Sequence, residues 1–512
     1  MKKICITLFA LMLTALLASC DRQGGRGAVE LDEHGRWRTI TVAVMADVVT
    51  MDPQGSNETH SVRIRDHIFD SLIYRCENQI LNPGLATEWG WVDDRTVYFR
   101  LRQGVRFHDG SPFTAEDVKF TLERARDSPF VGFRYTAIDH VEIINPYYVH
   151  VHLHSTFALI FEQIAEAAAH IVPRAHVERI GPDRFASEPI GTGPYKFVNW
   201  ARGSRIDLTR WDDHWSHRRG QTQNLSFRVI TEMANRTIEL ETGGVDIAFD
   251  IPPGDVNRVR NDPRLQMLMS PSFTLNYIGI NTERPPFNDR RVRQAMNYAI
   301  DMESIVEVVY GGIGQVLAGP LVSLAWGVDP DLRPFPHDPQ RAAQLFAEAG
   351  FPNGFHATIW ANENQQRIDM AEIIQHQLMP FGITLDISVL EWGTYLERTI
   401  AGEHHMAIFG WAGGMPDATF FGNFHSDSRG PDGNISFFSN AEFDRLLDAS
   451  RNTMDDERRR QYYIQAQRLI RYEAPWIFVW EGASTHAARA DLRGFTFAPD
   501  AVFRLWSVYI EG

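Results

Sequence analysis

Residues 286–301 read Pro-Phe-Asn-Asp-Arg-Arg-Val-Arg-Gln-Ala-Met-Asn-Tyr-Ala-Ile-Asp, shortly after Ile280-Asn-Thr. Three further motifs flank this stretch. The first is Leu81-Asn-Pro-Gly-Leu-Ala-Thr-Glu-Trp89, followed by Val105-Arg-Phe-His-Asp-Gly110 and Phe113-Thr-Ala-Glu-Asp-Val118. The second is Pro189-Ile-Gly-Thr-Gly-Pro-Tyr-Lys-Phe197, and the third is Asn434-Ile-Ser with Phe437-Phe-Ser-Asn440. The four motifs follow one another along the chain, and the pattern to which they belong extends from about Thr39 to the C-terminus.

Strand and helix signals alternate around these motifs. Thr96 to Arg102 has the period of two that is typical of a strand. Thr114 begins a capping-box pattern that predicts a helix burying Val118, Leu122 and Ala125. Asp338-Pro339 predicts another helix start, and Gly350 a stop. This alternation indicates a mixed α/β protein.

The four motifs resemble the family 5 extracellular solute-binding proteins, which include dipeptide, oligopeptide and nickel types. The resemblance implies a two-lobed periplasmic binding protein fold (type II, cluster C) with an extra inserted domain. The ligand cleft is expected between the lobes, with the strands that cross between them acting as a hinge. Family membership alone does not identify the ligand.

The pattern predicts five parts. Residues 1–19 are a lipoprotein signal peptide and 20–36 a flexible tether. A first lobe is expected from 37–80, 187–270 and 486–512, an inserted domain of that lobe from 81–186, and a second lobe from 271–485.

The first twenty residues predict export. Lys2 and Lys3 precede an uncharged stretch to Ala18, which is shorter than the roughly 20 residues of a membrane span. Leu17-Ala18-Ser19-Cys20 resembles a lipobox, so Cys20 is the expected lipidation site. The resemblance implies a protein in the periplasmic space, anchored to the outer leaflet of the cytoplasmic membrane, or on the cell surface of a single-membrane organism. Asp21 resembles a signal for retention at the inner membrane.

Composition excludes one class of partner. The net charge of −15 falls to about −17 once Lys2 and Lys3 are removed, which argues against nucleic acid because its backbone demands a basic surface. Of three cysteines, Cys5 leaves with the leader and Cys20 is the proposed anchor, so Cys76 cannot form an internal disulfide.

The expected ligand-binding stretch is Phe409-Gly-Trp-Ala-Gly-Gly-Met-Pro-Asp417. Peptide-binding family members often carry an Asp three residues after this Trp to pair with the α-ammonium group of the ligand. Here that position is Gly414, whereas Asp417 matches a family Pro-Asp-Pro turn better. The usual amine clamp is therefore missing, although Asp47, Asp52 or Glu391 could replace it in space. The candidate ligand-binding residues are Trp411, Gly413, Gly414, Asp417, Trp392 and Tyr395.

The ligand class stays open between a peptide or similar small organic solute, an oligosaccharide and nickel. Aromatic rings at Trp392, Tyr395 and Trp411 suit an uncharged, sugar-like ligand, but core packing explains them as well. Gly413 and Gly414 fit a tight turn as readily as close approach to a ligand.

Metal and catalytic patterns are weak. His150, His152 and His154 alternate and would share one face of a strand, where they could hold zinc or nickel. A solvated face over inward Val149, Val151 and Leu153 is the favoured interpretation, so neither a metal site nor a cofactor is predicted. No zincin motif, nucleophile elbow or paired-cysteine spacing occurs. The sequence predicts no catalytic residue and no enzyme.

The leading functional hypothesis is the substrate-binding lipoprotein of an ABC importer. Its expected partners are the ligand, the ABC permease and ATPase subunits, and the membrane through the lipid anchor. A monomer is expected from the family. The alternatives are a ligand-binding module for a sensory partner and an anchored hydrolase.

Overall fold

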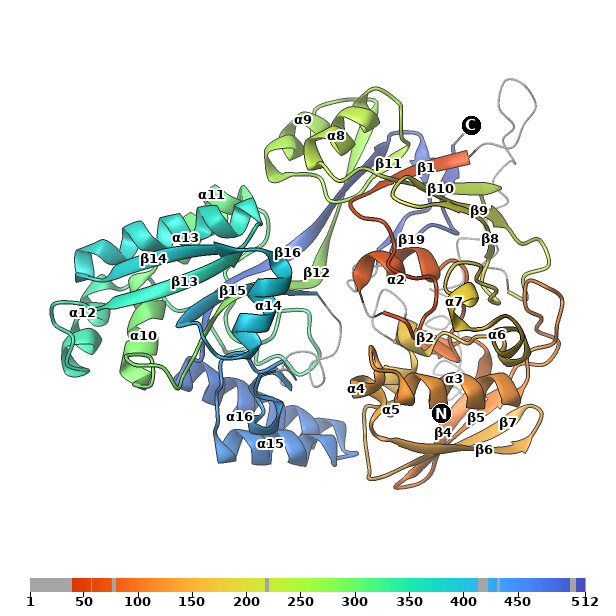
Figure 1. Ribbon diagram of the computed structural model, residues 1–512, viewed down its shortest axis with the longest axis horizontal. Helices are drawn as coiled ribbons and strands as arrows, with labels where there is room; N and C mark the ends of the chain where they lie inside the picture. Colours follow the sequence, from red (N-terminus) through yellow and green to blue (C-terminus); the bar gives the residue numbers. More distant parts are fainter. Residues whose placement is uncertain are drawn as a thin grey trace, which may run out of the picture.

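The computed structural model describes residues 39–511, apart from 57, 76–79, 217–220, 413–421, 431–432 and 498–502. Figure 1 shows two bodies joined by two long strands, β12 (Leu265–Ile280) and β16 (Trp476–Arg489). No helix among the described residues is both long and apolar enough to cross a bilayer.

One sheet of ten described strands runs through both bodies, in the order β14-β13-β15-β12-β16-β11-β1-β10-β9-β8. We call the half with β11, β1, β10, β9 and β8 the first lobe, and the half with β13, β14 and β15 the second lobe. The first-lobe strands are β1 (Thr39–Val44), β8 (Tyr195–Ala201), β9 (Arg205–Arg210), β10 (Asn224–Val229) and β11 (Ile247–Ala248). The second-lobe strands are β13 (His356–Asn362), β14 (Thr384–Leu390) and β15 (Met406–Ala412).

The first lobe also carries a separate four-stranded sheet in the order β4-β5-β7-β6, which we call the inserted sheet. Its strands are β4 (Ala86–Asp93), β5 (Thr96–Leu101), β6 (Ile138–Asn145) and β7 (Tyr148–Leu153). All four strands lie within residues 81–186. Short strand pairs complete the first lobe: β2 (Ile73–Arg75) with β3 (Leu81–Pro83), β17 (Leu492–Arg493) with β20 (Tyr509–Ile510), and β18 (Thr496–Phe497) with β19 (Phe503–Arg504).

Helices cover both sheets. The first lobe and inserted sheet carry α2 (Thr59–Arg65), α3 (Ala115–Asp127), α4 (Gly132–Tyr135), α5 (Ile160–Ile164), α6 (Arg174–Ile180), α7 (Pro182–Phe185), α8 (Met233–Glu241) and α9 (Val256–Arg260). The second lobe carries α10 (Arg290–Ala299), α11 (Met302–Tyr310), α12 (Pro339–Glu348), α13 (Gln365–Leu378), α14 (Trp392–Ile400), α15 (Ala441–Arg451) and α16 (Asp456–Glu473). The predicted starts of α3 and α12 are confirmed: Thr114 and Asp117 form a capping box, and the Asp338 side chain accepts a hydrogen bond from Arg341 N.

The second-lobe sheet is buried on both faces. On β12, Ile278 and Ile280 face one hydrophobic cluster, whereas Leu275 and Tyr277 face another. Strand β15 alternates in the same way between these two clusters. Two-sided burial is typical of strands covered by helices on both faces.

The glycines of the Pro189-to-Phe197 motif are explained by packing. A Cβ atom at Gly193 would lie 2.5 Å from the backbone carbon of Ile68, while Gly193 N donates to Ile68 O at 2.9 Å. Only glycine permits this approach. The motif therefore docks the segment before β8 against the residues after α2.

Arg236 of α8 ties together the ends of two first-lobe strands. Its side chain is fully buried. The guanidinium donates to the carbonyl oxygens of Ile230 and Thr231, after β10, at 2.8 and 2.9 Å. It also donates to those of Phe249 and Asp250, after β11, at 3.0 and 3.2 Å. One planar cation thus satisfies four backbone acceptors, a geometry that a lysine cannot reproduce.

We expect Arg236→Lys to lower the free energy of unfolding by about 2 to 4 kcal/mol, because carbonyls would lose their buried donors. Chemical denaturation would measure the change. The matched control is Arg258→Lys on α9, whose half-exposed guanidinium pairs with Glu241 and Asp255. That change should stay within about 0.5 kcal/mol. Equal effects of the two substitutions would contradict the role given to Arg236.

Among the described residues, the fully buried His67, His404 and His486 and the partly buried His108 are held as neutral imidazoles. Burial lowers the pKa of His67, His108 and His404 from 6.5 to about 4, and that of His486 to about 3. His67 shows why the neutral form is required: Leu505 N donates to its Nε2 at 3.0 Å, so this nitrogen must be an acceptor. Its Nδ1 lies 3.0 Å from the carbonyl oxygen of Arg63, to which it donates.

Because these folded-state pKa values lie below the unfolded value, the unfolded chain takes up protons first as the pH falls. The stabilisation that depends on these neutral histidines is fully present above pH 6.5. It should be lost progressively as the pH falls to about 4. Each such histidine contributes a slope approaching 1.4 kcal/mol per pH unit. Urea denaturation between pH 7.5 and 4.5 tests this, and a flat profile between pH 6.5 and 4.5 would contradict it.

Candidate functional site

The carboxyl ends of three second-lobe strands meet at one edge. Strand β13 pairs in parallel with both β14 and β15. Helices α13 and α14 begin just after β13 and β14, and residues 413–421 follow β15. In open α/β sheets, ligands bind in the crevice outside such carboxyl ends.

The first lobe has a matching edge. Strand β1 pairs in parallel with β10 and β11, so Val44, Val229 and Ala248 end side by side. Helix α2 follows β1 and lies on the side of the first lobe that faces the second lobe (Figure 1).

The two edges face each other across β12 and β16. Strand β11 is antiparallel to β16 and therefore runs toward the second lobe, whereas β15 is antiparallel to β12 and runs toward the first. Beyond β11, Ile251 exchanges hydrogen bonds with Thr485 of β16. At the second-lobe edge, Leu275 pairs with both Trp411 and Glu481. Four residues of β16 separate these levels, which is roughly 13 Å of strand.

Trp411 and Trp392 both lie at the second-lobe edge. Trp411 is partly buried, and its buried Nε1 has no hydrogen-bond partner among the described residues. An unsatisfied buried donor is costly, which makes this N–H a candidate contact for a bound molecule. Trp392 is 46% exposed and stacks on Tyr395 with ring centroids 5.7 Å apart.

Tyr395 has a different place. It is fully buried, and its hydroxyl donates to the carbonyl oxygen of Ile408 at 2.7 Å. In this conformation Tyr395 packs against the ring of Trp392 and is not itself accessible to a ligand. Gly413, Gly414 and Asp417 lie outside the described residues, as does Cys20.

The three carboxylates considered as a substitute amine clamp all hold protein groups. Asp47 accepts from Trp200 Nε1 at 2.9 Å and Gly203 N at 2.6 Å. Asp52 is buried and forms a bidentate pair with Arg124. Glu391 caps α14 through Gly393 N and Thr394 N, at 2.9 and 3.0 Å. Each of these three carboxylates therefore has a structural role in this conformation.

Arg367 was missed by the sequence analysis and lies at the second-lobe edge, in the first turn of α13. It donates to Asn362 Oδ1 at 2.8 Å, and no carboxylate of a described residue pairs with it. Gly410 creates the space for it: a Cβ atom there would lie 3.0 Å from Arg367 Nη2 and 2.4 Å from Asn276 Oδ1. Burial raises the pKa of Tyr277 and Tyr395, and the positive charge of Arg367 opposes that rise in both.

The pattern that could have revealed Arg367 is its place three residues after Asn364, the helix cap of α13. An arginine in the first turn works against the helix dipole. Such a residue is tolerated where its charge serves another purpose.

The first-lobe edge carries an ion pair. Arg63 of α2 donates to Asp250 at 3.0 Å, and Asp250 follows β11 in the left-handed region at φ +56°. Burial alone would raise the pKa of Asp250, but the adjacent Arg63 guanidinium lowers it well below its ordinary value. The edge therefore presents a paired charge at neutral pH.

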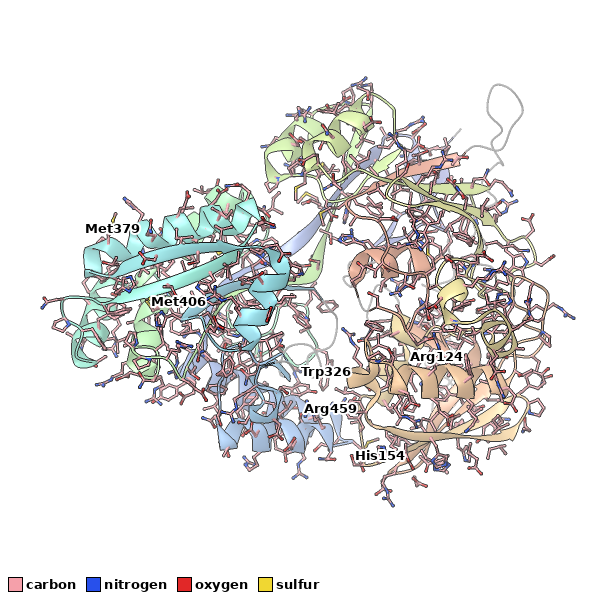
Figure 2. All side chains as sticks on the ribbon, in the orientation of Figure 1. Arg124, His154, Trp326, Met379, Met406 and Arg459 are labelled. Atoms are coloured by element: carbon pink, nitrogen blue, oxygen red, sulfur yellow. The ribbon has the colours of Figure 1, made fainter. Side chains whose placement is uncertain are left out.

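The bodies also touch at the far end of the gap. Ala158 N, beyond the inserted sheet, donates to the carbonyl oxygen of Arg451 in α15 at 3.1 Å. Figure 2 places Trp326 and Arg459 on the second-lobe side of this region, where the guanidinium carbon lies 4.8 Å from the indole centroid. Trp326 is 44% exposed.

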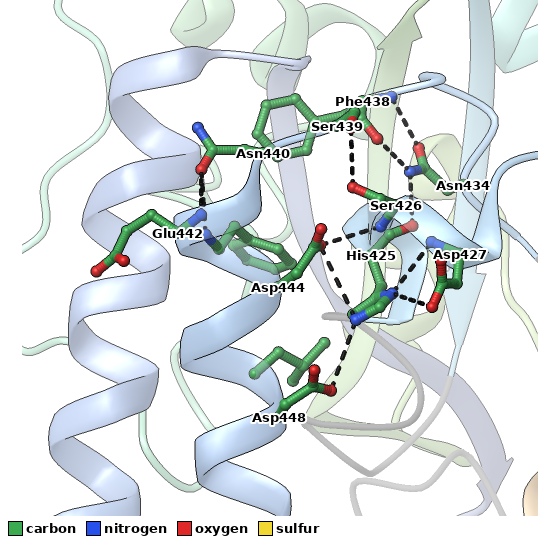
Figure 3. Close-up of polar contacts among 12 residues, drawn as sticks. His425, Ser426, Asp427, Asn434, Phe438, Ser439, Asn440, Glu442, Asp444 and Asp448 are labelled. Atoms are coloured by element: carbon green, nitrogen blue, oxygen red, sulfur yellow. Dashed lines mark hydrogen bonds and ion pairs between the residues drawn. The ribbon is translucent and has the colours of Figure 1, made fainter.

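The loop after residues 413–421 is held by a polar network (Figure 3). Asn434, from the Asn-Ile-Ser motif, is fully buried and donates to the carbonyl oxygens of His425 and Phe438 at 3.0 and 2.9 Å. Ser426 N donates to Asp444 of α15 at 3.0 Å. The motif thus organises the loop that returns from the second-lobe edge to α15.

A cavity of about 720 Å³ lies elsewhere in the second lobe, between α11 and residues 312–334. None of the predicted site residues is among the described residues that line it. Glu481 faces this cavity, but it already accepts hydrogen bonds from Ser323 N and Gln315. The facing edges, which carry the unpaired donors, are therefore the better candidate site.

Comparison with known proteins agrees with this geometry. The haem-binding protein A of Haemophilus influenzae is 30% identical over 468 residues, covering 84% of each chain. The glutathione-binding protein GsiB of Salmonella typhi is 29% identical over 479 residues, covering 91% of this chain and 93% of that protein.

Among solved structures, the periplasmic binding protein DppA of Helicobacter pylori, which is associated with an ABC transporter and was solved with the peptide STSA, superimposes with a TM-score of 0.82. It is 27% identical, and the match covers 94% of this chain and all of that one. These relatives are solute-binding proteins and not enzymes, and the same holds for this chain. The model of the bacterial extracellular solute-binding proteins, family 5 Middle, matches residues 81–432. The chain therefore belongs to the family 5 solute-binding proteins of ABC transporters.

Proposed function

We propose that this chain captures a peptide or a similar small organic solute between the facing strand edges and delivers it to a membrane permease. The observation that carries the proposal is the pair of opposed edges, with the unpaired groups of Arg367 and Trp411 on one of them. Concave sites with a few convergent polar groups are the usual form of a solute-binding cleft.

The charges at the second-lobe edge favour a carboxylate on the solute. Arg367 has no described acidic partner, and a guanidinium binds a carboxylate through two parallel hydrogen bonds. Helix α13 also begins at this edge, and helix N-termini stabilise negative charge. The carboxylates Asp47, Asp52 and Glu391 are already occupied, so recognition rests on the acidic end of the solute more than on an amine.

The aromatic side chains add a surface for the body of the solute. Trp392 offers an exposed ring face, and Trp411 offers an indole N–H. The same rings would suit an oligosaccharide, which is the second candidate ligand, and nickel is the third. Gly413, Gly414 and Asp417, which follow Trp411 directly, complete the proposed site.

We also propose that the chain is a lipoprotein anchored through Cys20, with 20–36 as its tether. The support is the Leu17-Ala18-Ser19-Cys20 pattern and the glycine-rich stretch after it. A tether of this kind lets the lobes reach the permease while the anchor stays in the membrane. We keep 81–186, 271–485 and the three first-lobe pieces as the proposed domain boundaries, and a monomer as the proposed state.

A thermal-shift screen of the purified protein against di- and tripeptides, oligosaccharides and nickel identifies the solute class. A ligand at 100 times its dissociation constant adds about 2.7 kcal/mol of stability, which gives a clear shift. We expect carboxylate-bearing peptides to give the shift. A response to oligosaccharides alone would keep the transport role and replace the peptide class.

Arg367→Gln should weaken binding of the identified peptide by about 10- to 100-fold, because a hydrogen bond to a charged group is lost. The C-terminally amidated peptide should bind the native protein just as weakly and should be unaffected by the substitution. Calorimetry on these four combinations measures the coupling. Arg460→Gln, an exposed position on α16, is the charge-matched control. An unchanged affinity of Arg367→Gln for the free acid would contradict this role.

Cys20→Ser should release the protein from the membrane fraction, because the acylated thiol is the proposed anchor. Cell fractionation followed by immunoblotting measures the change. Cys76→Ser is the control and should remain bound. If the Cys20→Ser protein stays on the membrane as firmly as the native protein, the lipoprotein proposal is wrong.

A further inference from the structure

A cluster of histidines lies on the outer face of the inserted sheet, apart from the solute site. In β7, Val149, Val151 and Leu153 are buried, while His150 and His152 face outward, as the sequence predicted. The structure adds residues that the sequence analysis did not consider, because the neighbouring strand β6 supplies partners. In the register, Glu142 stands opposite His150, and His140 stands opposite His152.

Three side chains bring metal-binding atoms together. His152 Nε2 lies 3.1 Å from Glu142 Oε2, and His150 Nδ1 lies 3.9 Å from the same oxygen. One donor atom from each of Glu142, His150 and His152 lies within 4.8 Å of the others. Three atoms at this spacing can converge on one ion at ordinary bond lengths of roughly 2.0–2.2 Å with small rotamer changes.

The surroundings orient the ligands. The hydroxyl of buried Thr96 lies 3.4 Å from His152 Nδ1, which leaves His152 Nε2 directed toward Glu142. On its other side, His152 stacks on His140 with centroids 4.4 Å apart and planes 11° from parallel. A hydroxyl behind one imidazole nitrogen is the arrangement that second-shell groups take at metal sites.

We propose that Glu142, His150 and His152 bind a divalent transition-metal ion, with zinc as the best match. Two imidazoles and one carboxylate form a ligand set that zinc accepts, and three protein ligands leave a position for water. Calcium and magnesium are disfavoured because they prefer oxygen ligands throughout. The ion would join β6, the edge strand of the inserted sheet, to β7.

The test is equilibrium dialysis of the purified, chelator-treated protein against zinc. We expect one zinc ion per chain at this site, and His152→Ala, His150→Ala or Glu142→Gln should each abolish it. His154→Ala is the matched control, because His154 follows β7 directly (labelled in Figure 2), is exposed and is not one of the three clustered residues. That variant should bind zinc as the native protein does.

A substitution next to His152 distinguishes metal coordination from nonspecific attraction of zinc to surface charge. Thr96→Val keeps all three ligands and should weaken zinc binding by about 10- to 100-fold, since the orienting hydroxyl is lost. The unfolding temperature of each variant in EDTA should equal that of the native protein, while added zinc should raise it only where the trio is intact. Zinc binding that survives His152→Ala, or no stoichiometric binding by the native protein, would overturn the proposal.

Two variants in the same experiment distinguish the zinc site from the proposed solute site. Arg367→Gln should bind zinc normally, and His152→Ala should bind the solute normally. Loss of zinc in Arg367→Gln would show that the ion sits between the lobes and would overturn the assignment to the inserted sheet.

Discussion

The antiparallel pairing of β12 with β16 is the constraint on which the rest of the molecule depends. These two strands belong to both half-sheets, and their register sets where each half-sheet ends. The register shifts between Pro271 and Leu275, in the stretch between the lobes. Because β11 and β15 are each antiparallel to a crossing strand, their carboxyl ends must point toward each other. In open α/β sheets, ligands bind outside carboxyl ends of this kind.

That topology also determines which charged side chains lie at the two facing edges. Each edge collects the residues that follow its strands, and most of their polar groups are consumed in holding the edge together. Arg236 binds four carbonyl groups, and Asp47, Asp52 and Glu391 serve as structural acceptors. Two groups at the second-lobe edge keep donors without a described partner: Arg367 and the Trp411 N–H. In a chain of net charge −15, a guanidinium with no carboxylate partner among the described residues is the feature that supports the proposed acidic ligand.

The inserted sheet carries a cluster of polar side chains that lies apart from the two facing edges. Its inner face is apolar and packs around residues such as Phe99 and Val118, so its outer face is free to carry polar groups. The histidines there stand in cross-strand pairs, and pairing is what brings their nitrogens near Glu142. The histidine cluster thus arises from the alternation of side chains along strands, whereas the proposed solute site arises where strands end.

The sequence by itself determined the family, the α/β class and the local elements. The Thr114 and Asp338 caps and the alternation along β7 depend only on neighbouring residues, so periodicity and capping chemistry predict them. The sequence also pointed to Trp411, through the family resemblance of the stretch around it, and to Trp392, as an aromatic face for a ligand. Their neighbours in space were decided only by the tertiary structure. Arg367 lies against Gly410, and Glu142 against His152, through strand order and register, which sequence periodicity does not encode. The roles of Asp47, Asp52 and Glu391 were likewise decided by tertiary structure, because a carboxylate is free or occupied only once the chain has folded around it.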